Sequence, residues 1–93
     1  MATFVVHIRY GEDRELLERV RPEHRDYSKS LSDRGVLLAG GPFVDGDGAM
    51  LVYETTDRAE LDRILAEDPY TREGVLRETT VREWKAVTGS WLG

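Results

Sequence analysis

The fold is decided by residues 36–54, VLLAGGPFVDGDGAMLVYE, in which two apolar runs flank a polar turn. Val36 to Ala39 is short and apolar and predicts one strand, and Ala49 to Glu54 predicts another. Between them, Asp45-Gly46-Asp47-Gly48 has the composition of a hairpin turn. We therefore expect these two strands to be antiparallel neighbours.

The residues before this hairpin predict a strand and then helical structure. Thr3 to Tyr10 places large apolar side chains at every second position, which is typical of a half-buried strand. Asp13 can cap a short helix that breaks at Pro22, and a second helical piece is expected to begin at Pro22 and run to about Arg34. Gly35 is expected to end this piece.

The residues after the hairpin predict a further helix and a last strand. Asp57 and Glu60 have the spacing of a capping box at a helix start. Asp68-Pro69 is expected to end that helix, because the residue before a proline favours extended backbone. After a turn around residues 71–74, the chain is expected to resume as a strand from about Leu76 to Val87.

The predicted elements follow the order βαββαβ within 93 residues. This order predicts an α+β, ferredoxin-like fold with one antiparallel sheet and both helices on one of its faces. A chain of this length buries one small core, so residues 1–93 are expected to form a single domain. The open face of the sheet is expected to carry Val5, Leu51, Tyr53 and Trp84 and to pack on a second copy of the chain in a homodimer. The tail with Trp91 could dock on the partner subunit.

Composition and charge exclude several classes of protein. The net charge of −5, from 18 acidic and 13 basic residues, argues against nucleic-acid binding, which needs a basic surface. The absence of cysteine excludes disulfides, a thiolate nucleophile and metal sites with sulfur ligands. No apolar run approaches membrane-spanning length, so we expect no membrane partner and a cytoplasmic protein. Arg19, Arg21 and Arg25 alternate with acidic residues, which indicates a solvated helix face, with anion binding as the alternative.

His24 is the strongest candidate for chemistry, because an imidazole, whose unperturbed pKa is about 6.5, can accept and donate a proton near neutrality. It shares a helix face with Tyr27 and Leu31, so its ring is expected to point inward. Asp68, ahead of Pro69, could orient this imidazole if the two side chains face one hollow. The alternatives are a hydrogen-bonded core histidine and a carboxylate that binds only loop amides.

Four segments have an order and spacing that fit together: Arg21-Pro22-Glu23-His24, residues 35–42 (GVLLAGGP), Asp68-Pro69-Tyr70 and Glu83-Trp84. The set, which spans most of the chain, resembles the YCII-related (YciI-like) family of small ferredoxin-like proteins. The resemblance implies a dimeric α+β barrel with a His/Asp site, carried here by His24 and Asp68. The family includes lyase-like enzymes that act on small, often aromatic-derived compounds, and the resemblance implies an activity of this kind. Tyr70 stands where relatives commonly have phenylalanine, and its hydroxyl could alter what the pocket accepts.

Further residues are candidates to bind a substrate beside His24. Gly40-Gly41-Pro42 could line the pocket with free amides able to hold an oxyanion or carboxylate, or could form a kink at a strand end. Ser28, four residues after His24, could share its face as a pocket residue or nucleophile, although helical serines are usually surface or backbone-bonded residues. The walls of the pocket are expected to be aromatic and to come from Tyr27, Tyr70 and Trp84.

His7 lies on the strand face opposite Phe4, and we interpret it as a partly buried or interface residue. The alternative is a second pocket group or a metal ligand. A metal site would require His7, His24 and a carboxylate to converge, and no ligand spacing in the sequence demands this. We therefore expect no metal and no organic cofactor.

Two functions remain open. One is a small acid–base enzyme of the lyase or isomerase type, acting for instance by elimination on a small aromatic-derived, enol or lactone compound. In it His24 is the general acid–base and Asp68 its orienter. The alternative is a non-catalytic module that binds a small molecule or a protein partner on the same dimeric barrel.

Overall fold

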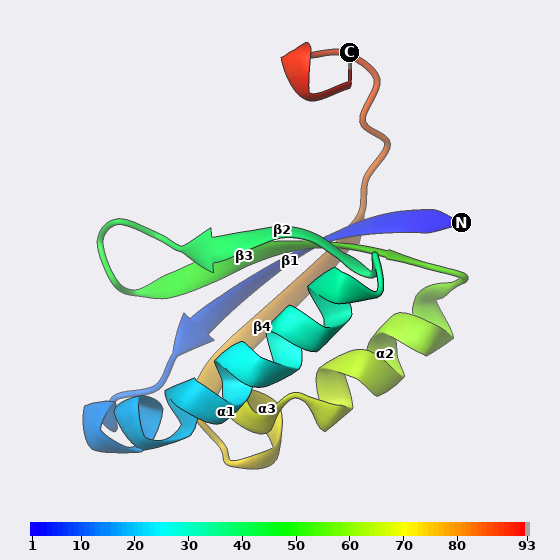
Figure 1. Ribbon diagram of the computed structural model, residues 1–93. Coiled ribbons are helices and arrows are strands. Elements are labelled where there is room, and N and C mark those ends of the chain that lie inside the picture. Colours follow the sequence, from blue (N-terminus) through cyan, green and yellow to red (C-terminus); the bar gives the residue numbers. More distant parts are fainter. Residues whose placement is uncertain (93) are drawn as a thin grey trace.

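In the computed structural model, which describes residues 1–92, one four-stranded sheet carries the α-helices on a single face (Figure 1). The strands are antiparallel and lie in the order β2-β3-β1-β4. This arrangement confirms the predicted α+β, ferredoxin-like fold. The elements are β1 (Ala2–Tyr10), α1 (Arg14–Asp33), β2 (Leu37–Pro42), β3 (Gly48–Thr55), α2 (Arg58–Glu67), α3 (Pro69–Arg72), β4 (Leu76–Glu83) and the short helical turn η1 (Ser90–Leu92).

The register between β1 and β3 decides which side chains enter the core. Phe4 pairs with Tyr53 and Val6 with Leu51, and all four side chains are buried against the helices. The expectation that Leu51 and Tyr53 lie on the open sheet face was therefore wrong. Side chains alternate between faces along a strand, so an error of one position in parity moves every residue to the other side.

The helix before the hairpin is continuous, which corrects the predicted break at Pro22. α1 runs through this proline from Arg14 to Asp33. The missing proline N–H removes a single helical hydrogen bond, while residues on both sides of it, Leu17 and Leu31, are buried in the core. The predicted N-cap is confirmed, because the Leu16 amide donates to the Asp13 side chain at 3.0 Å.

The second half of the chain also follows the prediction with adjusted ends. Asp57 caps α2 by accepting from the Glu60 amide at 2.9 Å. Asp68-Pro69 ends α2 as expected, and the turn expected at residues 71–74 is found at residues 73–74, after the short helix α3. The predicted Leu76–Val87 strand is shorter, because β4 ends at Glu83. No helix in residues 1–92 is long and apolar enough to cross a membrane.

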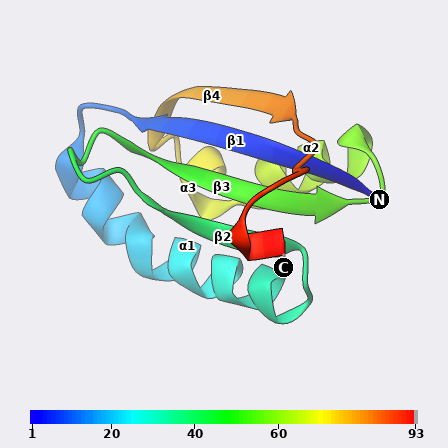
Figure 2. The same cartoon turned by 90° about the horizontal axis from the view of Figure 1, so that it is seen from above.

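The hairpin turn is confirmed at residues 45–48, and β2 extends further than predicted, to Pro42. Gly48 begins β3 where the chain passes close to β1, and a side chain at this position would collide with the Ile8 carbonyl. Glycine is therefore required for this close approach. Beyond β4, residues 84–92 leave the sheet on its open side and cross above it towards β2 (Figures 1 and 2).

Candidate functional site

Two side chains 44 positions apart in the sequence meet beneath the sheet. His24 projects from the middle of α1, and Asp68 lies at the junction of α2 and α3. The Nδ1 atom of His24 is 2.8 Å from Oδ1 of Asp68. Because a carboxylate oxygen only accepts, Nδ1–H donates, and a neutral ring then presents its lone pair on Nε2.

The Asp68 carboxylate is itself held by the backbone. Its Oδ1 atom accepts a second hydrogen bond from the Tyr70 amide at 2.9 Å, which caps α3. Only 6% of Asp68 is exposed. The Asp68 carboxylate thus binds a backbone amide and the imidazole at the same time, so the two roles considered for this residue occur together. A carboxylate fixed in this way holds the imidazole more firmly than a mobile one would.

Tyr70 fixes the plane of the His24 ring. The two rings are stacked with centroids 3.8 Å apart and an interplanar angle of 6°. Tyr70 is buried, and the Tyr10 ring packs edge-on against it at 5.9 Å. Tyr70 also lines a hollow together with Arg21, and the interaction of these two side chains is the main cause that raises the pKa of the Arg21 guanidinium above its ordinary value. The imidazole is therefore oriented by an edge contact with Asp68 and a face contact with Tyr70.

A hollow of about 310 Å³ lies beside the imidazole. Ser28 stands at its edge, with Oγ 3.5 Å from Nε2 of His24. The remaining lining comes from α1, from β1, β2 and β3, and from Tyr70 of α3: Tyr10, Arg21, Arg25, Leu37, Gly40, Gly41, Pro42, Ala49 and Leu51. This arrangement can exchange a proton between Nε2 and a small molecule in the hollow.

The hollow brings together six of the residues selected from the sequence: His24, Ser28, Gly40, Gly41, Pro42 and Tyr70. Asp68 lies behind the imidazole and does not line the hollow. Tyr27 does not line it either, because its hydroxyl donates to the Ile64 carbonyl at 2.7 Å and joins α1 to α2. Burial raises the pKa of this phenol above its ordinary value.

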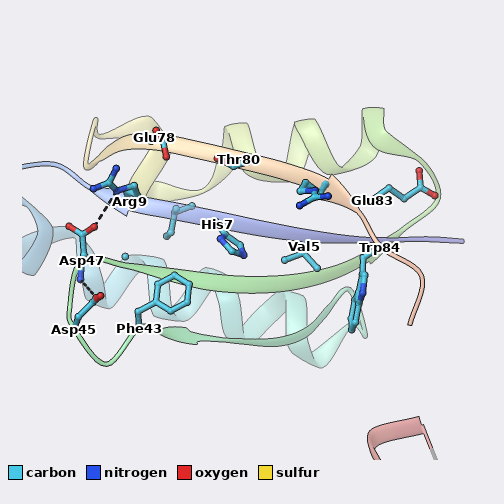
Figure 3. Close-up of a pocket in the computed structure, with 13 residues that line it drawn as sticks. Val5, His7, Arg9, Phe43, Asp45, Asp47, Glu78, Thr80, Glu83 and Trp84 are labelled. Carbon is cyan, nitrogen blue, oxygen red and sulfur yellow. Dashed lines mark hydrogen bonds and ion pairs between the residues drawn. The ribbon is translucent and has the colours of Figure 1, made fainter. Parts of the chain in front are cut away.

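His7 and Trp84 lie on the opposite, open face of the sheet (Figure 3). His7 falls between the inward residues of β1, so the alternation of the strand turns it away from His24. It packs edge-on against Phe43 at 5.7 Å, within a separate hollow of about 710 Å³. In residues 1–92 no group of three or more metal-ligating side chains gathers.

Sequence reasoning missed Arg21, Arg25 and Tyr10 as lining residues. The spacing of residues 21, 24, 25 and 28 was the available signal, because positions i, i+3, i+4 and i+7 form one helix face. Gly40 pairs with Leu51, which faces the hollow. A Cβ on Gly40 would lie 3.4 Å from the Leu51 side chain, so the missing side chain keeps this space open.

Solved structures share this fold. A 5-chloro-2-hydroxyhydroquinone dehydrochlorinase of Burkholderia phenoliruptrix, in complex with 2,5-dihydroxybenzoquinone, superposes with a TM-score of 0.76 at 23% identity, over 89% of this chain and 93% of that one. An antibiotic biosynthesis monooxygenase gives a TM-score of 0.60 at 25% identity, over 95% and 100%. The protein PA3566 of Pseudomonas aeruginosa gives 0.63 at 15% identity, over 94% of each chain.

The sequence comparison gives the family. Among curated proteins, none matches this chain significantly. The model of the YCII-related domain, however, matches residues 2–85, which is nearly the whole chain. The match includes both His24 and Asp68 and all the residues that line the hollow beside them. This chain therefore belongs to the YCII-related domain family.

Proposed function

We propose that this protein is a small acid–base enzyme of the lyase or isomerase type. His24 is its general acid–base, and Asp68 is the positioning residue that holds the imidazole. The proposal is carried by one observation, the 2.8 Å contact between Nδ1 of His24 and Oδ1 of Asp68, which leaves Nε2 at the edge of the hollow. A histidine held in this way contributes about 10² to 10⁴-fold to a proton-transfer step.

The substrate class that we propose is a small ring derived from an aromatic compound, or a related enol or lactone. The structural relative from Burkholderia is a dehydrochlorinase of a hydroxylated chloroarene and binds a dihydroxybenzoquinone. The hollow is bordered by the stacked rings of His24 and Tyr70, and its volume is at the low end of the usual range of about 300 to 1,000 Å³, which suits a compound of one ring.

The proposed elimination balances without an external oxidant or reductant. In a keto tautomer of a chlorinated, hydroxylated ring, the chlorine sits on a tetrahedral carbon. Nε2 of His24 removes a proton from a hydroxyl conjugated to that carbon, and the O–H bonding pair becomes part of a new carbonyl. Chloride leaves with the electrons of its carbon bond, and Nε2 later releases the proton to water. Asp68 keeps the imidazole of His24 in one orientation through both proton transfers.

The proposal is tested by substituting each histidine separately, His24 as the test and His7 as the matched control. Turnover is measured as chloride release and as absorbance change on a panel of chlorinated phenolic, enol and lactone compounds. We expect His24→Gln to reduce turnover by about 10² to 10⁴-fold, and His7→Gln, on the other sheet face, to leave it unchanged. Circular dichroism confirms that each variant is folded. Equal turnover in wild type and His24→Gln would remove the imidazole from the mechanism.

We further propose that two copies pair through the open faces of their sheets. This face carries partly exposed large apolar side chains, with Met50 37%, Phe43 40% and Trp84 44% exposed. Apolar surface of this kind is favourably removed from water by a second copy. The tail with Trp91, 82% exposed, rises on the same side and would contact the partner.

The same apolar face favours the second candidate function, a binding or interaction module without catalysis. Such a module would keep the hollow and the dimer, but its function would not depend on the proton of His24. The His24→Gln experiment separates the two candidates, because only the enzyme loses its activity.

A further inference from the structure

The hollow beside His24 differs in charge from the rest of the molecule. The chain carries a net charge of −5. In the described residues, the lining of the hollow includes two guanidinium groups and the imidazole but no carboxylate. The one carboxylate close by, Asp68, lies behind the imidazole ring and is bonded to it. A cationic recess in an acidic protein is an arrangement that attracts anions locally.

The two arginines of this recess are not engaged by acidic side chains. Within residues 1–92, the salt bridges use other basic residues, and neither Arg21 nor Arg25 forms one. Glu18, one helical turn before Arg21, contributes to the raised pKa of the Arg21 guanidinium but forms no salt bridge with it. Arg19, by contrast, is on the same helix but does not line the hollow.

Arg21 also shares the lining of the hollow with Tyr70, the residue whose ring stacks on His24. Arg25 follows His24 and lies one turn after Arg21, so both guanidinium groups belong to the helix face that borders the imidazole. A planar guanidinium donates paired hydrogen bonds to oxyanions, which an ammonium group does less well.

We infer that this hollow binds a small planar ring that carries a negatively charged oxygen group, and that Arg21 and Arg25 are the residues that recognise the charge. The inference rests on the proposed function and names the substrate class of the same site. It also gives the arginines a part in the reaction, because a base that removes a proton from a ring hydroxyl leaves negative charge on oxygen. Preorganised donors beside that oxygen stabilise the charge as it forms.

The size of the ligand follows from β2. Gly40 faces the hollow and lacks a side chain, and a Cβ there would already touch Leu51 and Leu37 at 3.4 and 3.6 Å. Tyr70 and His24, which form a stacked pair, line the same hollow. A position without a side chain and a flat aromatic pair leave room for one planar ring.

The test uses benzoate, a planar ring anion, and benzamide, its uncharged counterpart of the same shape. Binding is followed by NMR chemical-shift titration of the folded protein and of three variants: Arg21→Gln, Arg25→Gln and Arg19→Gln. We expect wild type to bind benzoate at least about tenfold more tightly than benzamide. Arg21→Gln and Arg25→Gln should each weaken benzoate binding by about 10 to 100-fold, the range for a lost charge-assisted hydrogen bond. Benzamide binding should change little.

The control arginine makes the result specific. Arg19→Gln removes the same charge from the same helix, outside the hollow, and should leave benzoate binding within about twofold, since exposed charges are screened over about 10 Å at moderate salt. Equal weakening in all three variants would overturn the inference, because it would indicate the net charge alone. No preference of wild type for benzoate, or no effect of Arg21→Gln and Arg25→Gln, would also overturn it.

The failure of this inference differs from the failure of the proposed function. If His24→Gln abolishes turnover while the arginine variants keep the benzoate affinity and the KM of wild type, the proposed acid–base function is supported and the inferred anion site is refuted. If the arginine variants lose benzoate binding and His24→Gln turns over substrate like wild type, the anion site stands and the acid–base role is wrong.

Discussion

The sharpest stability prediction concerns Asp68→Ala, because one oxygen of this carboxylate serves two donors. Oδ1 accepts from Nδ1 of His24 at 2.8 Å and from the Tyr70 amide at 2.9 Å. Loss of a helix cap costs about 0.5 to 2 kcal/mol. A largely buried donor left without its acceptor costs about 1 to 3 kcal/mol. Since 14% of the His24 side chain is exposed and water reaches part of it, we expect a total of about 2 to 4 kcal/mol.

Two further variants separate these contributions. Asp57→Ala removes the exposed cap of α2, in which the Glu60 amide donates at 2.9 Å, and should cost only about 1 kcal/mol. Asp68→Asn keeps an acceptor oxygen in the same place and should also cost about 1 kcal/mol. Its turnover should nevertheless fall by about 10²-fold or more, because an amide fixes the imidazole tautomer less well than a carboxylate.

The assay is urea unfolding followed by circular dichroism, in which each variant keeps the slope of wild type and shifts its midpoint. A double-mutant cycle of Asp68→Asn with His24→Gln should show a coupling free energy of about 0.5 to 1 kcal/mol. The reasoning is refuted if Asp68→Ala unfolds at the same urea concentration as Asp57→Ala. It is equally refuted if the two substitutions in the cycle are additive.

Three other predictions concern the hollow, the buried phenols and the open sheet face. Gly40→Val should fill the hollow and weaken benzoate binding at least about tenfold in the NMR titration. Binding as tight as that of wild type would count against the hollow as the site. The free energy of unfolding should fall as the pH rises above 10.0, because burial raises the pKa of the Tyr10, Tyr27 and Tyr53 phenols above that value and the unfolded chain then holds fewer of their protons than the folded chain. The stabilisation is complete below pH 10.0 and is lost as the pH approaches the folded-state pKa values. A constant urea midpoint up to about pH 11 would contradict this prediction. Met50→Glu should raise the dimer dissociation constant about 100-fold or more in sedimentation equilibrium, because it places a charge within the proposed interface, and an unchanged constant would rule out pairing through this face.

The fold could be predicted because its signals are local. The polar turn at residues 45–48, the caps at Asp13 and Asp57 and the stop at Pro69 each act through neighbouring backbone. What failed depended on tertiary structure. The parity of β3 follows from its pairing with β1, and the continuity of α1 through Pro22 follows from burial on both sides of the proline.

The candidate site divides in the same way. The contact of His24 with Asp68 was anticipated from two prolines and a family resemblance, and the stacking of Tyr70 on the imidazole was not. Tyr27 lies on the predicted helix face, but its hydroxyl donates a hydrogen bond to the Ile64 carbonyl of α2 instead of bordering the hollow. No local pattern tells which of several residues on one face will meet a neighbouring helix and which will border open space.

The most direct test of the account is a crystal structure of this protein with 2,5-dihydroxybenzoquinone, the ligand of the structural relative from Burkholderia. The account predicts the ring in the hollow of α1 and β2, with one of its oxygens at about 2.6 to 3.2 Å from Nε2 of His24. A ring bound instead on the open sheet face, between His7 and Trp84, would contradict it.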